Sequence, residues 1–143
     1  MLSNTCKAAI KAVIYLASRE GSGKKSGVKE IAKFINGSEH TVSKILQTLV
    51  RQKIINSIKG PTGGFFITKK QHKQPIIAIV NAIDGKDIFN ECGLGLSKCS
   101  STHPCPIHDE YKKGREIIQE LFTSKTISAL CEPLENGLTY LQD

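Results

Sequence analysis

The segment from residue 28 to residue 68 constrains the fold of this chain more than any other feature. Residues 28–35 carry apolar side chains at helical spacing, and Asn36-Gly37 tolerates the positive φ that ends a helix. A second amphipathic helix is predicted over residues 39–52. Two short helices joined by a tight turn are typical of a helix-turn-helix, although a helical hairpin in any small α domain has the same pattern.

The residues that follow favour the helix-turn-helix. Residues 54–58 are β-branched and strand-like, and residues 65–68 form a second short strand. The turn between them, 59–64, reads Lys-Gly-Pro-Thr-Gly-Gly, and its glycines let the backbone approach a phosphate or enter a minor groove. A strand hairpin directly after a helix-turn-helix is a wing. A nucleotide-binding phosphate loop fits poorly, because the turn joins two strands and lacks the Gly-Lys-Ser/Thr ending into a helix.

Charge agrees with a nucleic-acid partner confined to one part of the chain. Residues 1–74 hold 14 of the 20 Lys and Arg but only three of the 13 acids. An unevenly charged solvated surface would show the same bias. If the wing hypothesis holds, the start of the second helix reads base edges in a major groove and the turn of the wing meets the backbone or minor groove. The expected DNA-binding residues are Ser38, Glu39, His40, Thr41, Ser43, Lys44, Gln47, Lys59, Gly60, Pro61, Thr62 and Gly63.

A second feature is a group of cysteines after the wing. Cys92, Cys99 and Cys105 fall within fourteen residues, and His108 follows three positions later. Three thiolates and an imidazole suit a thiophilic metal, either iron in an iron–sulfur cluster or zinc. A thiol redox switch would need only two of the cysteines. His103 is a spare candidate, and spacing alone does not separate these chemistries.

The chain continues into a longer helix, predicted over residues 109–122. Its apolar stripe suggests a partner helix, with packing on the chain's own domain as the alternative. The expected dimer-interface residues are Tyr111, Gly114, Ile118 and Leu121. Residues 75–83 fit a short buried helix, and residues 124–143 look like a short helix and a tail. We expect Cys6 and Cys131, which lie in helical contexts, to be packing residues.

Several motifs together resemble the Rrf2 (IscR/NsrR) family of winged-helix transcriptional regulators. The turn signature is specific in combination with the cysteine loop, and the resemblance extends over nearly the whole chain. The matching segments are 57–65 for the wing, 2–17 for the first helix, 28–32 for the start of the helix-turn-helix, Cys92, Cys99 and Cys105 for the cluster loop, and 108–111 for the start of the dimerisation helix.

The resemblance implies a bacterial homodimer that binds a palindromic double-stranded DNA operator. It also implies a cluster, 2Fe–2S in preference to 4Fe–4S, held by Cys92, Cys99 and Cys105. In the family the fourth ligand is either a His that matches His108 or an acid of the partner's first helix. That acid would fall near Lys7, which is no ligand, so the resemblance favours His108.

Three positions depart from the family pattern. The first cysteine gap has six residues where five is common, Thr41 stands where Tyr is common, and Lys53 stands at a helix-to-strand turn where Gly is usual. We therefore expect that turn to close differently. The departures leave the fold unchanged and bear on which operator sequence is read.

The sequence thus predicts a mainly α fold with a small β-hairpin wing and a long dimerisation helix. We expect a winged helix-turn-helix domain over residues 1–83, a cysteine-rich cluster loop over 84–108, and a dimerisation helix with tail over 109–143. The predicted function is a cytoplasmic transcriptional regulator, not an enzyme, whose DNA binding is modulated by the cluster. The alternative is a winged-helix regulator with structural zinc or thiol sensing at the same cysteines. No stretch approaches the ~18 apolar residues of a membrane span.

Overall fold

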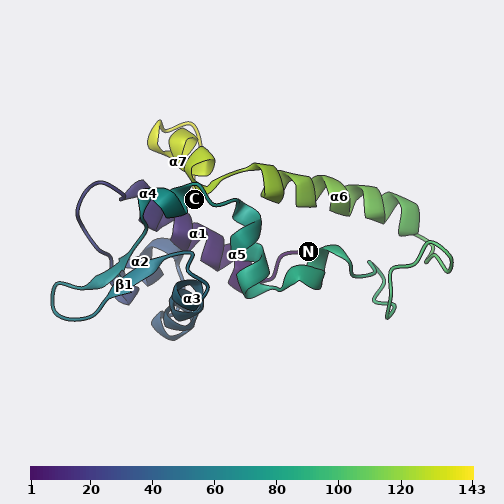
Figure 1. The fold of residues 1–143 in the computed structure, drawn as a ribbon, viewed down its shortest axis with the longest axis horizontal. Coiled ribbons are helices and arrows are strands. Elements are labelled where there is room, and N and C mark those ends of the chain that lie inside the picture. The colour runs from purple at the N-terminus through teal and green to yellow at the C-terminus, as the bar shows by residue number, and fades with distance from the viewer.

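A computed structural model describes all residues from 1 to 143 and confirms a mainly helical fold with a two-stranded antiparallel hairpin (Figure 1). None of its helices is both long and apolar enough to cross a bilayer. In chain order the elements are α1 (Asn4–Ser18), α2 (Val28–Ile35), α3 (Glu39–Arg51), β1 (Asn56–Ile58), β2 (Gly64–Phe66), α4 (Lys69–His72), α5 (Ile76–Ile83), the 3-10 helix η1 (Lys86–Phe89), α6 (His108–Ser124) and α7 (Ile127–Glu135).

Most of the chain packs around α1. Ala9, Ala12 and Val13 of this helix are fully buried, and their small side chains let other helices come close. They belong to a cluster of 19 buried residues to which α2, α3, α5 and α7 all contribute. Because α7 supplies Ile127 and Cys131, the C-terminal helix returns to the same core as the helix-turn-helix. We call residues 1–83 and 125–143 the body.

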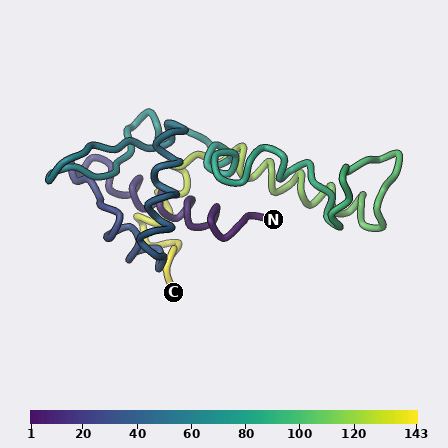
Figure 2. Tube along the Cα trace, turned by 90° about the horizontal axis from the view of Figure 1, so that it is seen from below, coloured from purple at the N-terminus to yellow at the C-terminus, as the bar shows by residue number.

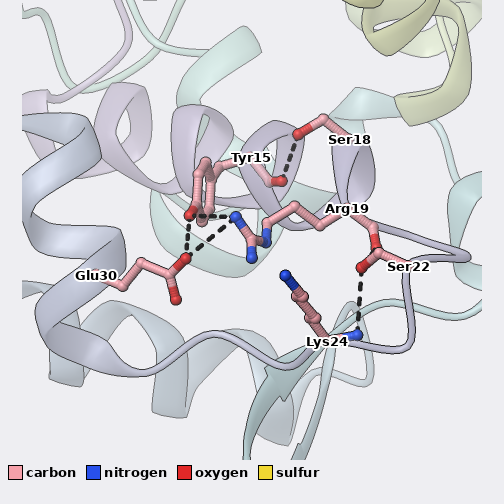
Figure 3. A network of polar contacts seen from close by, with 6 residues as sticks. All are labelled: Tyr15, Ser18, Arg19, Ser22, Lys24 and Glu30. Atoms are coloured by element: carbon pink, nitrogen blue, oxygen red, sulfur yellow. Dashed lines mark hydrogen bonds and ion pairs between the residues drawn. The ribbon is translucent and has the colours of Figure 1, made fainter.

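A polar network holds α2 against the end of α1 (Figure 3). The Tyr15 hydroxyl donates to Glu30 Oε1 at 2.5 Å, and Arg19 Nη1 lies 3.1 Å from the Tyr15 oxygen and 3.2 Å from Glu30. Burial, followed by the hydrogen bond to Glu30, raises the pKa of Tyr15. The Tyr15 ring also packs on Phe34, with centroids 4.4 Å apart. These contacts orient the first helix of the helix-turn-helix.

The turn between α2 and α3 closes as the sequence predicted, and the turn after α3 does not. Asn36 ends α2 in the left-handed region at φ 54°, and the Ser38 hydroxyl caps α3 by accepting from Thr41 N–H. Lys53 also adopts a left-handed backbone, at φ 59°. The expectation that this turn would close differently without glycine was wrong. Lys53 adopts the left-handed conformation itself, although only glycine does so without a steric cost.

The hairpin pairs Asn56 with Phe66 and Ile58 with Gly64. A third segment extends it, because Ser26 and Phe65 exchange two backbone hydrogen bonds, of 3.0 and 2.8 Å. The loop after α1 is therefore joined to the wing.

Residues 84–124, which we call the arm, leave the body. η1, the cysteine loop and α6 extend to one side in both views (Figures 1 and 2). A small cluster of Cys6, Val80 and Phe89 joins the arm to the body, and Ile118 and Phe122 of α6 pack against it. The chain then returns through two backbone hydrogen bonds, Ile76 N–H to Lys125 O at 2.9 Å and Ile127 N–H to Gln74 O at 3.0 Å.

Candidate DNA interface and cysteine site

The exposed surface of α3 carries most of the side chains expected to read DNA. Val42, Ile45, Leu46 and Leu49 turn inward and are buried, which leaves the opposite face of the helix to solvent. On that face Glu39, His40, Thr41, Lys44 and Gln47 are exposed, as is the capping residue Ser38, and Ser43 is half-buried.

Four of these side chains form two hydrogen-bonded pairs at the cap and within the helix. The Ser38 hydroxyl accepts from Thr41 N–H and lies 2.8 Å from Thr41 Oγ1, so it serves chiefly as the helix cap. Gln47 Nε2 donates to Ser43 Oγ at 3.1 Å. His40, Lys44 and Glu39 have no such intrahelical partner and remain the freest groups for a base edge.

The turn of the wing stands out from the body. Lys59, Gly60, Pro61 and Thr62 are exposed and Gly63 is half-buried. Gly60 has φ 105°, which side chains rarely adopt, and a Cβ on Gly63 would lie 2.0 Å from the Ile58 carbonyl oxygen. These two positions therefore require glycine for the tight turn that projects Lys59 outward.

Sequence reasoning missed the cationic residues that the structure brings to the wing. The pairing of Ser26 with Phe65 places Lys24 and Lys25 beside β2, and Lys25 Nζ lies 5.6 Å from the centroid of the Phe66 ring. The neighbouring Lys residues were a visible signal, but only the third strand segment shows that they join this surface.

The cysteine loop ends against the first turn of α6. His108 begins that helix and is 6% exposed, and its Nδ1 lies 3.4 Å from Cys99 Sγ. Cys92 and Cys105 are 9% and 8% exposed. His103 instead lies on the exposed side of the loop, where Nδ1 is 3.3 Å from Thr102 Oγ1. The spare candidate is therefore turned toward its own loop, and His108 is the histidine nearest to a cysteine.

The other two thiols of the loop interact electrostatically. Backbone N–H groups of Leu94 and Leu96 lower the pKa of Cys92. The Ile107 N–H acts in the same direction on Cys105, but burial and the neighbouring Cys92 thiol outweigh it and raise the pKa of Cys105. Each of the two thiols thus changes the pKa of the other.

Among the four expected ligands, Cys99 contacts His108, whereas the Cys92 and Cys105 thiols are linked only through their effects on each other's pKa. The charge on Cys99 also contributes to the raised pKa of Cys105. No three or more His, Cys, Asp or Glu side chains are grouped closely enough to hold a metal ion by themselves. By its donor chemistry the set fits a thiophilic metal or an iron–sulfur cluster, since it offers three sulfurs and one imidazole.

Cys6 and Cys131 are core residues, as expected. They are 0% and 3% exposed, in the small cluster and the main core respectively. Burial, followed by the charge of Asp84, raises the pKa of Cys6 to about 12. Burial, followed by the charge of Glu135, raises the pKa of Cys131 to about 11. Both thiols are therefore held neutral and away from the loop.

The structure separates α6 into two faces that the sequence stripe had merged. His108, Tyr111, Arg115, Ile118 and Phe122 are buried or half-buried and face the chain's own loop and body. Gly114, Ile117 and Leu121 are exposed on the other face, where Ile117 is 70% and Leu121 is 48% exposed. Of the four residues expected at a dimer interface, only Gly114 and Leu121 lie on the free face. Sequence reasoning missed Ile117, which follows Gly114 at helical spacing.

Comparison with known proteins places this geometry in a family. Residues 2–133 match the model of the Rrf2 family, which is described as an iron-dependent transcriptional regulator. The chain belongs to the Rrf2 family. It is 30% identical over 140 residues to an HTH-type transcriptional regulator of Aquifex aeolicus, with 96% of each chain covered. It is also 25% identical to the regulator NsrR of Geobacillus kaustophilus, with 92% of this chain and 89% of that one covered.

Solved structures of Rrf2-type proteins share the fold. The cysteine regulator CymR of B. subtilis superposes with a TM-score of 0.72 at 19% identity, covering 92% of this chain and 96% of that chain. T. potens IscR gives a TM-score of 0.72 at 17% identity, with 98% and 92% covered. The winged-helix fold, the role as a transcriptional regulator rather than an enzyme, and the family are thereby confirmed.

Proposed function

We propose that this Rrf2 regulator binds a palindromic operator as a homodimer and that an iron–sulfur cluster on the cysteine loop sets its affinity. The observation that carries the proposal is the pairing of Cys99 with His108 at 3.4 Å, at the first turn of α6. It brings a soft thiol from the middle of the loop to an imidazole on the helix that carries the free apolar face. The description of the family as iron-dependent supports the same chemistry.

DNA binding would use two surfaces of the body. The exposed face of α3, with His40 and Lys44, suits a major groove, and Lys59 at the wing suits a minor groove or the backbone. Lys24 and Lys25 beside the wing add phosphate contacts, whose contribution falls as salt rises. The excess of Lys and Arg in residues 1–74 supports this assignment.

Dimerisation would use the free face of α6. Ile117 and Leu121 form an apolar stripe, and the open space over Gly114 permits a second helix to approach closely. A two-fold axis through this face would place two α3 helices to meet two half-sites of a palindrome.

The cysteine loop fits the proposed cluster by its donors. Cys92, Cys99 and Cys105 would supply thiolates and His108 an imidazole. When bound, the cluster would supply a redox-active centre whose loss or change is the signal. The loop residues would hold it against α6, so that a change at the loop alters the orientation of the helix that joins the two bodies. Two conformations with different affinity for the operator would then shift in population.

The proposal is tested by measuring the iron content, the acid-labile sulfide content and the visible absorption of protein purified without oxygen. We expect iron and acid-labile sulfide in the wild type, with a visible absorption band, and their loss in Cys92→Ser, Cys99→Ser and Cys105→Ser. His108→Ala should retain a labile cluster with a lowered potential, because a His ligand raises the potential relative to thiolate. Cys6→Ser and Cys131→Ser are matched controls that should keep full iron and sulfide.

A second candidate is thiol or zinc sensing at the same residues. The observation in its favour is that the Cys92 and Cys105 thiols each affect the pKa of the other. Two neighbouring thiols would suffice for a disulfide switch, and zinc would accept three Cys and one His. The same purification distinguishes the candidates. Colourless protein with one zinc per chain, or without metal but with a reversible disulfide, would contradict the iron–sulfur proposal.

A further inference from the structure

Two side chains on the inward face of α6 contact the backbone on either side of Cys92. Arg115 Nη1 donates to the carbonyl oxygen of Glu91, the residue before Cys92, at 2.5 Å. The Tyr111 ring packs against Gly93, the residue after it, and a Cβ built on Gly93 would lie only 2.7 Å from that ring. The expected ligand Cys92 is thus held between two contacts to one helix.

The two side chains of α6 also support each other. Arg115 lies one turn after Tyr111, and its guanidinium carbon is 5.8 Å from the centroid of the Tyr111 ring, within cation–π range. Together with His108 they lie on one stripe of the helix. One rigid element therefore carries His108 directly and holds the backbone around Cys92.

The environment of Arg115 is unusual for a cation. The side chain is 6% exposed, makes no ion pair with a carboxylate, and leaves its Nε without a partner. A buried guanidinium is normally paired, because desolvating its charge is costly. Here the Glu91 carbonyl and the Tyr111 ring are the main contacts that offset the desolvation of the Arg115 charge. The position of Arg115 therefore depends on the loop, and the loop depends on Arg115.

We infer that Tyr111 and Arg115 form a clamp that positions Cys92 on α6 and couples the cysteine loop to the dimerisation helix. Both are positioning residues, since neither is a sulfur or imidazole ligand. A role of the clamp in sensing rests on the proposed function, but the contacts of Tyr111 and Arg115 with the loop require no cluster. Any rearrangement that moves Cys92 would pull on α6 at Tyr111 and Arg115, on the face opposite to Ile117 and Leu121.

Amide hydrogen exchange of the reduced, chelator-treated full-length protein tests the clamp without a cluster. Arg115→Met removes the donor but keeps an apolar chain, and it should speed exchange over residues 91–96 about tenfold, the effect of losing one hydrogen bond from a charged group. Exchange in α6 and in the body should stay unchanged. Arg115→Lys should restore part of the protection, and Lys113→Met on the exposed side of α6 is the matched control without effect.

Gly93→Ala provides a second variant that leaves Arg115 intact. Gly93 has no positive φ, so its added methyl group should act only through Tyr111. The substitution should loosen residues 91–96 in the wild type and have no further effect in a Tyr111→Ala background. If Arg115→Met does not fold, Gly93→Ala in the wild-type and Tyr111→Ala backgrounds is sufficient to test the clamp.

Unchanged exchange in both Arg115→Met and Gly93→Ala would overturn the clamp, as would a loosening spread evenly over α6. Iron and sulfide reconstitution of the same proteins separates the clamp from the proposed function. If wild type takes up no cluster but residues 91–96 still loosen in the variants, the clamp stands and the cluster proposal fails. If a cluster forms and the variants lose it no faster than wild type, with exchange unchanged, the clamp fails and the cluster proposal stands.

Discussion

The body and the arm of this regulator are stabilised in different ways. The body has a core cluster of 19 buried residues contributed by five helices and by residues that flank the two strands. The arm is joined to it by a cluster of three, Cys6, Val80 and Phe89, and exposes Leu94, Leu96 and Ile117. The core of the body is therefore formed by many of the chain's own residues, whereas the arm leaves apolar side chains exposed that the proposed dimer would cover.

The largest effect should come from the core of the body. Leu46 of α3 is fully buried, and Leu46→Ala should lower the free energy of unfolding by about 2–5 kcal/mol through lost burial and a residual cavity. Leu94→Ala, the same change on the exposed loop of the arm, should alter it by less than about 0.5 kcal/mol. Urea denaturation measures both. Equal losses would erase the distinction between body and arm.

The two faces of α6 should respond in opposite ways to a charge. Leu121→Asp should give a folded monomer, with the dimer dissociation constant raised at least about a hundredfold, because a charge would enter an apolar interface. Ile118→Asp should instead disrupt the packing of α6 on the body. Analytical ultracentrifugation with circular dichroism distinguishes these results. A stable dimer of Leu121→Asp with native size would contradict the proposed interface.

A smaller effect is expected where the body meets DNA. Lys59→Ala should weaken operator binding by roughly 1–2 kcal/mol and reduce the salt slope by about one, as expected for one lost phosphate or groove contact. Lys125→Ala, a change at an exposed cation just after α6, serves as the control and should bind like wild type. Fluorescence anisotropy at several salt concentrations provides the measurement, and an unchanged affinity and slope would remove the wing from the interface.

The smallest effect near neutral pH concerns the two core thiols. Folding raises their pKa from the ordinary value of 9.0 to about 12 for Cys6 and about 11 for Cys131. The folded state therefore binds more protons above pH 9, so this contribution to stability is complete below pH 9 and declines as pH rises toward those values. We expect unfolding midpoints to fall above pH 9, and to fall less in Cys6→Ala and Cys131→Ala relative to their own values at pH 8.

The body could be predicted from the sequence because its patterns are local. Apolar spacing marked the helices, Asn36 and Ser38 marked the turn and cap, and the glycines at 60 and 63 marked the wing. The prediction for the turn at Lys53 failed because the steric preference against positive φ is weak enough for the rest of the fold to overcome.

The arm was less predictable because its contacts are not local. An apolar stripe on α6 does not reveal which side faces the chain itself, so Ile118 was grouped with Leu121 and Ile117 was missed. Two features of the body were missed for the same reason, because the pairing of Ser26 with Phe65 and the return of α7 to the core also join residues far apart in sequence. The cysteine spacing indicated soft-metal chemistry, but the pairing of Cys99 with His108 required the folded loop.

In the proposed mechanism, the state of the cysteine loop controls DNA binding by the body. The most direct test is the affinity for a palindromic DNA duplex obtained by in vitro selection with this protein. The affinity is measured without oxygen for the cluster-loaded wild type, for the same protein after cluster removal, and for Cys99→Ser. We predict that cluster removal changes affinity by at least about tenfold, as for typical coupling between two sites, and that Cys99→Ser matches the cluster-free protein. Equal affinity in all three preparations would contradict the claim.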